Sequence, residues 1–200
     1  AFAGRINVKG YIWLLIVWTI LIYIPVCHWV WGNGFLAKMG FVDFAGGTVI
    51  HTSAGFGALA CAIFFGKRVL KKGEKTDPNN LVLVAIGVAL LWFGWFGFNS
   101  GGALAANELA ATAFVNTAVA LAVAMVAWMI IVKIRNGRVS FSDLLTGSVA
   151  GLATITPCAG YVEPWAAIGI GIIAAIVCTL CIELKNRMGW DDALDVWGVH

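Results

Sequence analysis

The chain has 200 residues, of which 61% are hydrophobic and 12% charged, and its mean hydropathy is +0.91. These values exclude an ordinary soluble domain and indicate a membrane protein, for which we expect no nucleic-acid partner. The net charge of +3 is modest, so the placement of the 13 lysines and arginines carries more information than their sum.

Six apolar runs are long enough to cross a bilayer. They cover residues 11–30, 44–66, 81–101, 109–132, 141–157 and 165–184, and the fifth is the shortest. We therefore predict an all-α polytopic membrane protein in which residues 1–200 form a single transmembrane domain. The chain opens on AFAGRINVKG, without the regions of a signal peptide, and stops at His200, which favours an internal fragment of a longer protein.

The basic residues are divided unequally between the two sets of loops. If the chain starts on the cytoplasmic side, one set holds 12 lysines and arginines and the other holds only Lys38. Cytoplasmic loops of membrane proteins are rich in lysine and arginine. We therefore predict a multi-pass protein of the cell membrane, with both ends of the six-span segment in the cytoplasm.

Small residues recur at helical spacing inside the runs. Gly97 and Gly101 are four residues apart, and so are Gly147 and Gly151. Small residues let helix backbones approach closely where lipid supplies no hydrophobic drive for association. The pattern predicts a tightly packed bundle.

The stretch VDFAGGTVIH, residues 42–51, places a carboxylate and an imidazole in an almost uncharged region. Asp43 precedes the second run, so its carboxylate is expected to cap the free amides around Ala45 and Gly46. His51 lies about 12 Å further along a helix and about 80° around it, so the two side chains are not expected to pair. An imidazole at that depth is either a buried neutral group with a local partner or part of a polar path.

A similar pattern closes the chain. DVWGVH contains Asp195, Gly198 and His200, and it looks like a degenerate second copy of DFAGGTVIH. Transporters are commonly built from inverted repeats whose functional groups meet near the middle of the membrane. His51 and His200 could therefore meet there.

Four motifs in order resemble the ammonium transporter family, the Amt/Mep/Rh group. They are DFAGGTVIHTSAG, GWFGFNSGG with ANELAATAFVNT, TPCAGYV, and DDALDVWGVH. The resemblance implies a homotrimer of inverted-repeat bundles with about eleven helices each. The six spans here resemble the fourth to the ninth, with His200 just inside the tenth.

The resemblance also assigns roles to particular residues. It makes His51 and His200 the paired histidines of a narrow apolar pore, with Phe98 as the inner ring of a phenylalanine gate. Trp31, in VWGNG, matches the aromatic wall of the external recruitment site. There an indole face attracts a small cation by about 0.5–2 kcal/mol.

One position departs from the family pattern. Many bacterial members carry a hydroxyl that accepts a hydrogen bond from ammonium where this chain has Gly102, with Ser100 two residues away. Recruitment is therefore expected to be weaker. Asn99 and Ser100, like Asp43, are taken as structural neighbours of the site.

The function implied is transport of ammonium, which is recruited externally and deprotonated before ammonia, or methylamine, passes the pore. No enzymatic activity, cofactor or metal is expected. A regulatory protein of the PII type could dock on the cytoplasmic face at the basic loop 67–75.

Two other functions stay open on the sequence. The chain could be the ammonium-sensing domain of a signalling protein, because the hydroxyl is lost at Gly102. It could also be a membrane-embedded metalloenzyme with His51 and His200 as ligands, although it lacks carboxylates at the spacing that such sites use.

Overall fold

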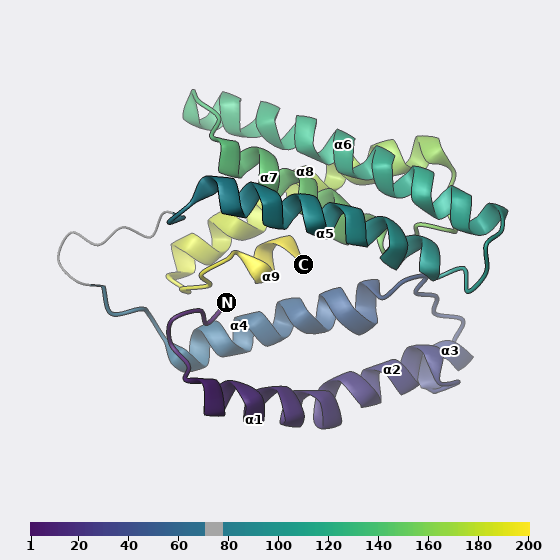
Figure 1. Ribbon diagram of the computed structural model, residues 1–200, viewed down its shortest axis with the longest axis horizontal. Helices are drawn as coiled ribbons and strands as arrows, with labels where there is room; N and C mark the ends of the chain where they lie inside the picture. Colours follow the sequence, from purple (N-terminus) through teal and green to yellow (C-terminus); the bar gives the residue numbers. More distant parts are fainter. Residues whose placement is uncertain (71–77) are drawn as a thin grey trace.

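Helices make up all of the regular structure in residues 1–70 and 78–200, which are the residues that the computed structural model describes. Figure 1 shows most of them running between two ends of a bundle. In chain order the elements are α1 (Val8–Trp18), the π-helical turn η1 (Thr19–Tyr23), α2 (Ile24–Trp31), α3 (Phe35–Lys38), the π-helical turn η2 (Gly47–Thr52), α4 (Ser53–Phe65), α5 (Leu81–Gly101), α6 (Glu108–Asn136), α7 (Phe141–Ile155), α8 (Pro164–Met188) and α9 (Val196–Val199).

Five helical segments within the described ranges are long and apolar enough to cross a membrane. They are Val8–Lys38, Gly47–Phe65, Leu81–Gly101, Glu108–Asn136 and Pro164–Met188. The fifth predicted span corresponds to α7, an apolar helix of 15 residues. At 1.5 Å per residue α7 covers only about 22 Å of a core about 30 Å thick. The protein is a polytopic helical membrane bundle, and the number of six spans stays a prediction.

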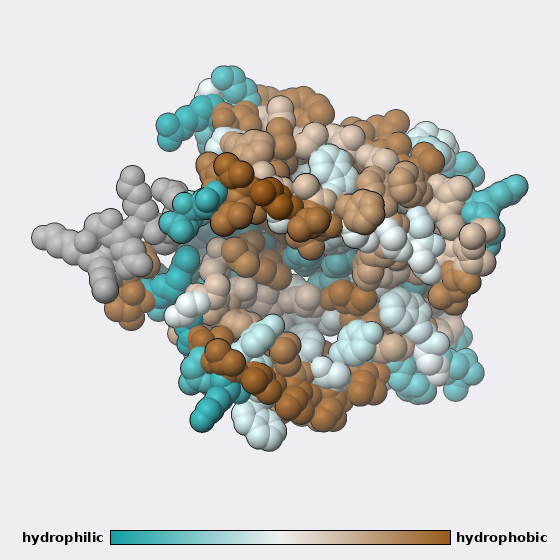
Figure 2. Space-filling model, in the orientation of Figure 1, coloured by the Kyte–Doolittle hydropathy of each residue, from teal (hydrophilic) through white to brown (hydrophobic). Residues whose placement is uncertain are grey.

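The helices form two groups with α9 between them. In Figure 1, α1, α2 and α4 lie on one side, while α5, α6, α7 and α8 lie on the other. In Figure 2 the more hydrophilic residues gather toward the two ends, and hydrophobic residues cover much of the outer surface between them. This distribution is the one that a bilayer requires of a polytopic protein.

Close helix contacts confirm one of the two glycine pairs. A Cβ on Gly147 would lie 2.6 Å from Cβ of Trp128, and one on Gly151 would lie 2.6 Å from the carbonyl oxygen of Ala120. The prediction for Gly97 and Gly101 is wrong within the described residues, because nothing there lies within 4 Å of a Cβ at either position. Helix α5 turns this face away from the other helices, whereas α7 is enclosed by α6 and α8.

An ion pair joins two loops at the end of the bundle where α4 ends. Arg68, three residues after α4, donates from Nε and Nη2 to the carboxylate of Asp191, with the shortest distance at 2.7 Å. The backbone N–H of Arg68 donates to the same carboxylate at 2.7 Å. Hydrogen bonding by Arg68 lowers the pKa of Asp191 below its ordinary value.

This pKa shift has a definite sign in a stability measurement. The ion pair stabilises the fold above the ordinary Asp pKa of about 3.9, and the stabilisation is lost as the pH falls through the lower folded-state pKa. We expect Asp191→Asn to lower the thermal midpoint in detergent at neutral pH, and the difference from wild type to shrink below about pH 4. A thermal-shift series across that range measures this, and a difference that grows with acid would contradict it.

Candidate functional site

The Asp43 carboxylate organises the start of the helix that carries His51. It is 5% exposed. One oxygen accepts hydrogen bonds from the amides of Gly46 and Gly47, at 2.9 and 2.6 Å, and the other accepts from Thr48 and Val49, at 2.7 and 3.1 Å. Capping is confirmed, but of the predicted amides only that of Gly46 donates to the carboxylate, and the set continues to Val49.

A wide helical turn explains that difference. Gly46 has φ of +108°, a left-handed conformation suited to glycine. Its carbonyl accepts hydrogen bonds from the amides of Ile50 and His51, four and five residues further on. A π-turn crowds more free amides around one point than an α-helix does. The predicted angle between Asp43 and His51 assumed 3.6 residues per turn, so it does not apply here.

The end of α7 holds this turn in place. The amide of Phe44 donates to the carbonyl of Pro157 at 2.9 Å. A Cβ on Gly47 would lie 2.3 Å from the Pro157 ring, so only glycine fits there. The His51 side chain is thereby carried into the interior, where the residue is 7% exposed.

His200 follows a short helix that is capped in a similar way. The carboxylate of Asp192, which is 3% exposed, accepts hydrogen bonds from the amides of Leu194 at 3.4 Å and Trp197 at 2.8 Å. The amide of His200 donates to the carbonyl of Val196 at 2.9 Å. The counterpart of Asp43 is therefore Asp192, not Asp195, since Asp192 is the buried carboxylate that caps the turn.

That correspondence leaves a signal in the sequence. Asp43 lies eight residues before His51, and Asp192 lies eight residues before His200. Asp195, which the sequence comparison paired with Asp43, lies only five residues before His200, so that pairing does not preserve the spacing. An aspartate eight residues before a histidine is therefore the feature that the two segments share.

The two imidazoles lie in contact. Nδ1 of His51 and Nδ1 of His200 are 3.2 Å apart. The indole of Trp95 stacks on both rings, with centroid distances of 5.1 Å to His51 and 6.4 Å to His200. The ring of Phe98 meets His51 edge-on at 5.9 Å. Nε2 of His51 is buried and has no hydrogen-bond partner in the part of the chain that the structure describes.

Trp95 is a site residue that the sequence analysis missed. Its indole N–H donates to the hydroxyl of Thr156 at 2.9 Å, and that hydroxyl donates to the carbonyl of Leu152 at 2.8 Å. Both Trp95 and Thr156 are buried. With ten tryptophans in the chain, composition offered no signal. The available signal in the sequence was its position three residues before Phe98, which is nearly one helical turn.

Residues next to Phe98 support the site from the end of α5. The side chain of Asn99 donates to the hydroxyl of Thr117 at 2.9 Å. The Ser100 hydroxyl is buried and lacks a hydrogen-bond partner among the described residues.

Trp31, 44% exposed, donates from its indole to the carbonyl of Asp43 at 2.8 Å. Asp43 therefore contacts the segments of Trp31 and His51, the first by its backbone and the second by its carboxylate.

Gly102 faces the backbone of Phe44 closely. A Cβ at this position would lie 2.6 Å from the Phe44 carbonyl oxygen and 3.0 Å from the nearest ring carbons. A side chain at position 102 would therefore have to displace Phe44.

We expect Gly102→Ser to lower the thermal midpoint, because the new side chain must displace Phe44. Overpacking of this kind costs about 1–3 kcal/mol. Gly101→Ser is the matched control, since nothing in the described chain lies within 4 Å of a Cβ there. A thermal-shift comparison of the two variants with wild type measures the effect. An unchanged thermal midpoint in Gly102→Ser would contradict the expectation.

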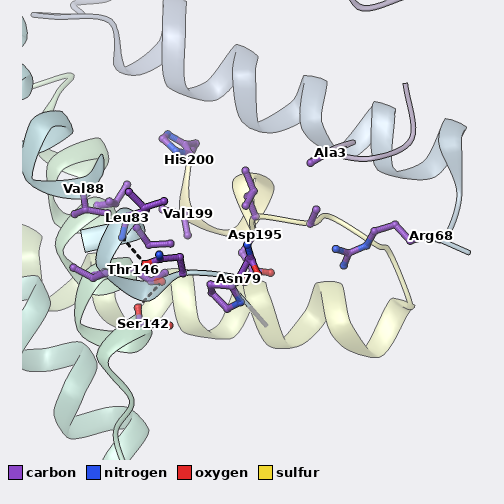
Figure 3. Close-up of a pocket in the computed structure, with 17 residues that line it drawn as sticks. Ala3, Arg68, Asn79, Leu83, Val88, Ser142, Thr146, Asp195, Val199 and His200 are labelled. Atoms are coloured by element: carbon purple, nitrogen blue, oxygen red, sulfur yellow. Dashed lines mark hydrogen bonds between the residues drawn. The ribbon is translucent and has the colours of Figure 1, made fainter. Parts of the chain in front are cut away.

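A cavity of about 630 Å³ lies beyond His200. Figure 3 shows His200 and Val199 on one side of it, with Leu83 and Thr146 near them and Asp195 further along. Arg68 lies toward its other end. His200 thus borders a space whose lining is mainly apolar, with polar and charged side chains such as Thr146, Asp195 and Arg68 among it.

The fold and this site define a polytopic helical membrane protein in which two capped segments bring two imidazoles together among aromatic rings. The chain belongs to the ammonium transporter family, because residues 1–200 match the Ammonium Transporter Family over their whole length.

Individual relatives agree with this assignment. The chain is 47% identical over 201 residues to an ammonium transporter of Aquifex aeolicus (strain VF5), covering 100% of this chain and 47% of the relative. The crystal structure of Candida albicans Mep2 is similar at a TM-score of 0.92 and 36% identity, covering 100% of this chain and 45% of Mep2. A structure of a Sensor Amt Protein is similar at a TM-score of 0.85 and 31% identity, covering 100% of this chain and 53% of that protein. The chain spans about half the length of the relatives it matches.

Proposed function

We propose that this chain forms the part of an ammonium transporter in which ammonium loses a proton and ammonia passes the two imidazoles. The observation that carries the proposal is the contact of His51 and His200, whose Nδ1 atoms are 3.2 Å apart in an aromatic surrounding. The family assignment supports ammonium as the substrate.

The contact restricts the tautomers of the pair. A hydrogen bond between two Nδ1 atoms needs one donor and one acceptor. In neutral imidazoles, the ring that donates from Nδ1 then has a free acceptor at Nε2, and the other ring carries a proton at Nε2. The pair can therefore offer both an acceptor and a donor to a passing ammonia.

Deprotonation separates ammonium from potassium. With a solution pKa of about 9.2, ammonium becomes ammonia at pH 7 at a cost of about 3 kcal/mol. Potassium has no such exit and must be desolvated as a charge in an apolar path. The exposed indole of Trp31 supports the recruitment step, since an aromatic face attracts a cation before it is desolvated.

The charge distribution supports an orientation. The loops at the Arg68 end hold most of the basic residues, so we place this end in the cytoplasm, with the cavity beyond His200 as the exit. A homotrimer in the cell membrane completes the proposal. The basic loop 67–75 is the proposed docking site for a PII-type partner. The positive charge of Arg68 in this loop is already paired with the carboxylate of Asp191. Lys71, Lys72 and Lys75 lie outside the described residues.

The test uses the full-length protein in liposomes. We expect uptake of labelled methylammonium, together with a transient current after an ammonium pulse if the proton crosses by its own route. Uptake without a current would retain the proposed transport and would show that the proton does not cross the membrane by a separate route. Binding of ammonium with neither uptake nor current would overturn the proposal.

That last result would favour a second candidate, an ammonium-sensing domain. The observation behind it is the likeness to the Sensor Amt Protein. A metalloenzyme gains nothing from the structure, since within the described ranges no three His, Cys, Asp or Glu side chains gather at one point. Stoichiometric metal in the purified protein would be needed to revive it.

A further inference from the structure

Three charged side chains connect the segments that lead to the two imidazoles. Arg5 is 8% exposed in its side chain. Its guanidinium donates to the carbonyl of Gly66, the C-cap residue that follows α4, and to the carbonyl of Asp191 at 2.6 Å. Arg68 holds the carboxylate of Asp191 by two nitrogens and by its own backbone N–H. Asp191 is therefore held through both its side chain and its main chain.

The connections run from this point to the site in both directions. Gly66 and Arg68 follow α4, which continues from η2 and His51. Asp191 precedes Asp192, whose carboxylate caps the turn before His200. Helices α4 and α9 also touch directly, since a Cβ on Gly55 would lie 3.1 Å from the carbonyl carbon of His200. The two imidazoles thus lie on elements that are tied to each other beyond the site.

We propose that Arg5, Arg68 and Asp191 form a clasp that sets the position of His200 against His51. They act as positioning residues for the transport proposed above, on which the kinetic part of this inference rests. None of the three touches an imidazole. Their effect passes through Asp192 and the α9 turn on one side and through α4 on the other.

The strength of the clasp follows from its geometry. An arginine that meets a carboxylate with two nitrogens fixes orientation as well as distance. A lysine at this position keeps the positive charge, but its ammonium group is a point charge that does not fix the orientation of the carboxylate. If the clasp positions His200, Arg68→Lys must have a smaller effect than Asp191→Asn. If only charge matters, Arg68→Lys must behave as wild type.

The experiment compares full-length variants in lipid bilayers by uptake kinetics and by ¹⁵N NMR of labelled histidines. For Asp191→Asn we expect the maximal rate of methylammonium uptake to fall about tenfold, since small misplacement of reacting groups has large effects on rate. The half-saturating concentration should change less than about twofold, because recruitment at Trp31 is remote from the clasp. The NMR signals of the hydrogen-bonded Nδ1 atoms should shift or disappear.

Arg187→Gln is the matched control. It removes a positive charge from an exposed side chain at the same end of the bundle, paired with Glu183 rather than with Asp191. We expect it to leave rate and NMR signals unchanged. If Asp191→Asn does not fold, Arg68→Lys carries the same test with the intermediate effect stated above.

Two results would overturn the clasp. One is an unchanged NMR spectrum of the histidine pair in both clasp variants. The other is a loss of uptake in proportion to the amount of folded protein, with the spectrum intact. If wild type carries no methylammonium, the proposed function fails, while the NMR comparison still decides whether the clasp positions His200.

Discussion

Asp43→Ala is expected to be among the most destabilising single substitutions in this chain. The change removes a buried carboxylate that accepts four backbone hydrogen bonds and leaves the amides of residues 46–49 without an acceptor. Unsatisfied buried amides and lost charged hydrogen bonds together should lower the free energy of unfolding by about 3–5 kcal/mol. Thermal midpoint and the yield of folded protein in detergent measure the effect.

Asp143→Ala provides the comparison. Asp143 also caps a helix start, with the backbone N–H and hydroxyl of Ser140 as its partners, but in an exposed position. Water can replace it there, so we expect a loss of about 1 kcal/mol or less. Equal losses for the two variants would show that the buried network around Asp43 contributes no more than an ordinary cap.

Asp43 also shows what a sequence can predict about this site. An aspartate before an apolar run predicts a cap, because the free amides at a helix start need an acceptor. It does not predict a π-turn, because that depends on Gly46 and on the Pro157 ring against Gly47, more than a hundred residues away in the chain. The capping was therefore predictable, and the number of amides involved was not.

The same distinction holds for the rest of the site. The pairing of His51 with His200 was suggested by a repeated motif, and it needed no knowledge of the helix packing. The stacking of Trp95 on both rings depends on where α5 lies against α4 and α9, and its hydrogen bond to Thr156 depends on α7. The spacing of Trp95 and Phe98 along α5 places them near one face of that helix, but it does not indicate which other helices they contact.

The glycine pairs illustrate the limit for the fold. Equal spacing predicted close packing at Gly97 and Gly101 as well as at Gly147 and Gly151, yet only the second pair meets another helix in residues 1–70 and 78–200. The spacing of two glycines indicates that one face of a helix lacks side chains. Whether another helix packs on that face depends on the arrangement of the neighbouring helices. For α7, the apolar run predicted a span to residue 157, whereas the helix stops at Ile155, so its role as a span stays a prediction.

The second large effect is expected at the imidazole pair itself. His51→Ala and His200→Ala should each lower methylammonium uptake by about ten- to a hundredfold, the rate equivalent of about 1.4–2.7 kcal/mol. Each change removes one member of the Nδ1 contact and leaves the other imidazole free to choose its tautomer. The defined combination of one donor and one acceptor is then lost, whichever residue is replaced.

The third histidine supplies the control. His28 lies in α2 and is exposed, so His28→Ala should leave uptake within about twofold of wild type, as surface substitutions usually do. The double variant of His51 and His200 tests whether the two imidazoles act together. If the pair acts as a unit, the double variant loses about as much as either single one, whereas independent sites would multiply their losses. Multiplied losses, or a single variant that keeps full uptake, would contradict the proposed role of the 3.2 Å contact in transport.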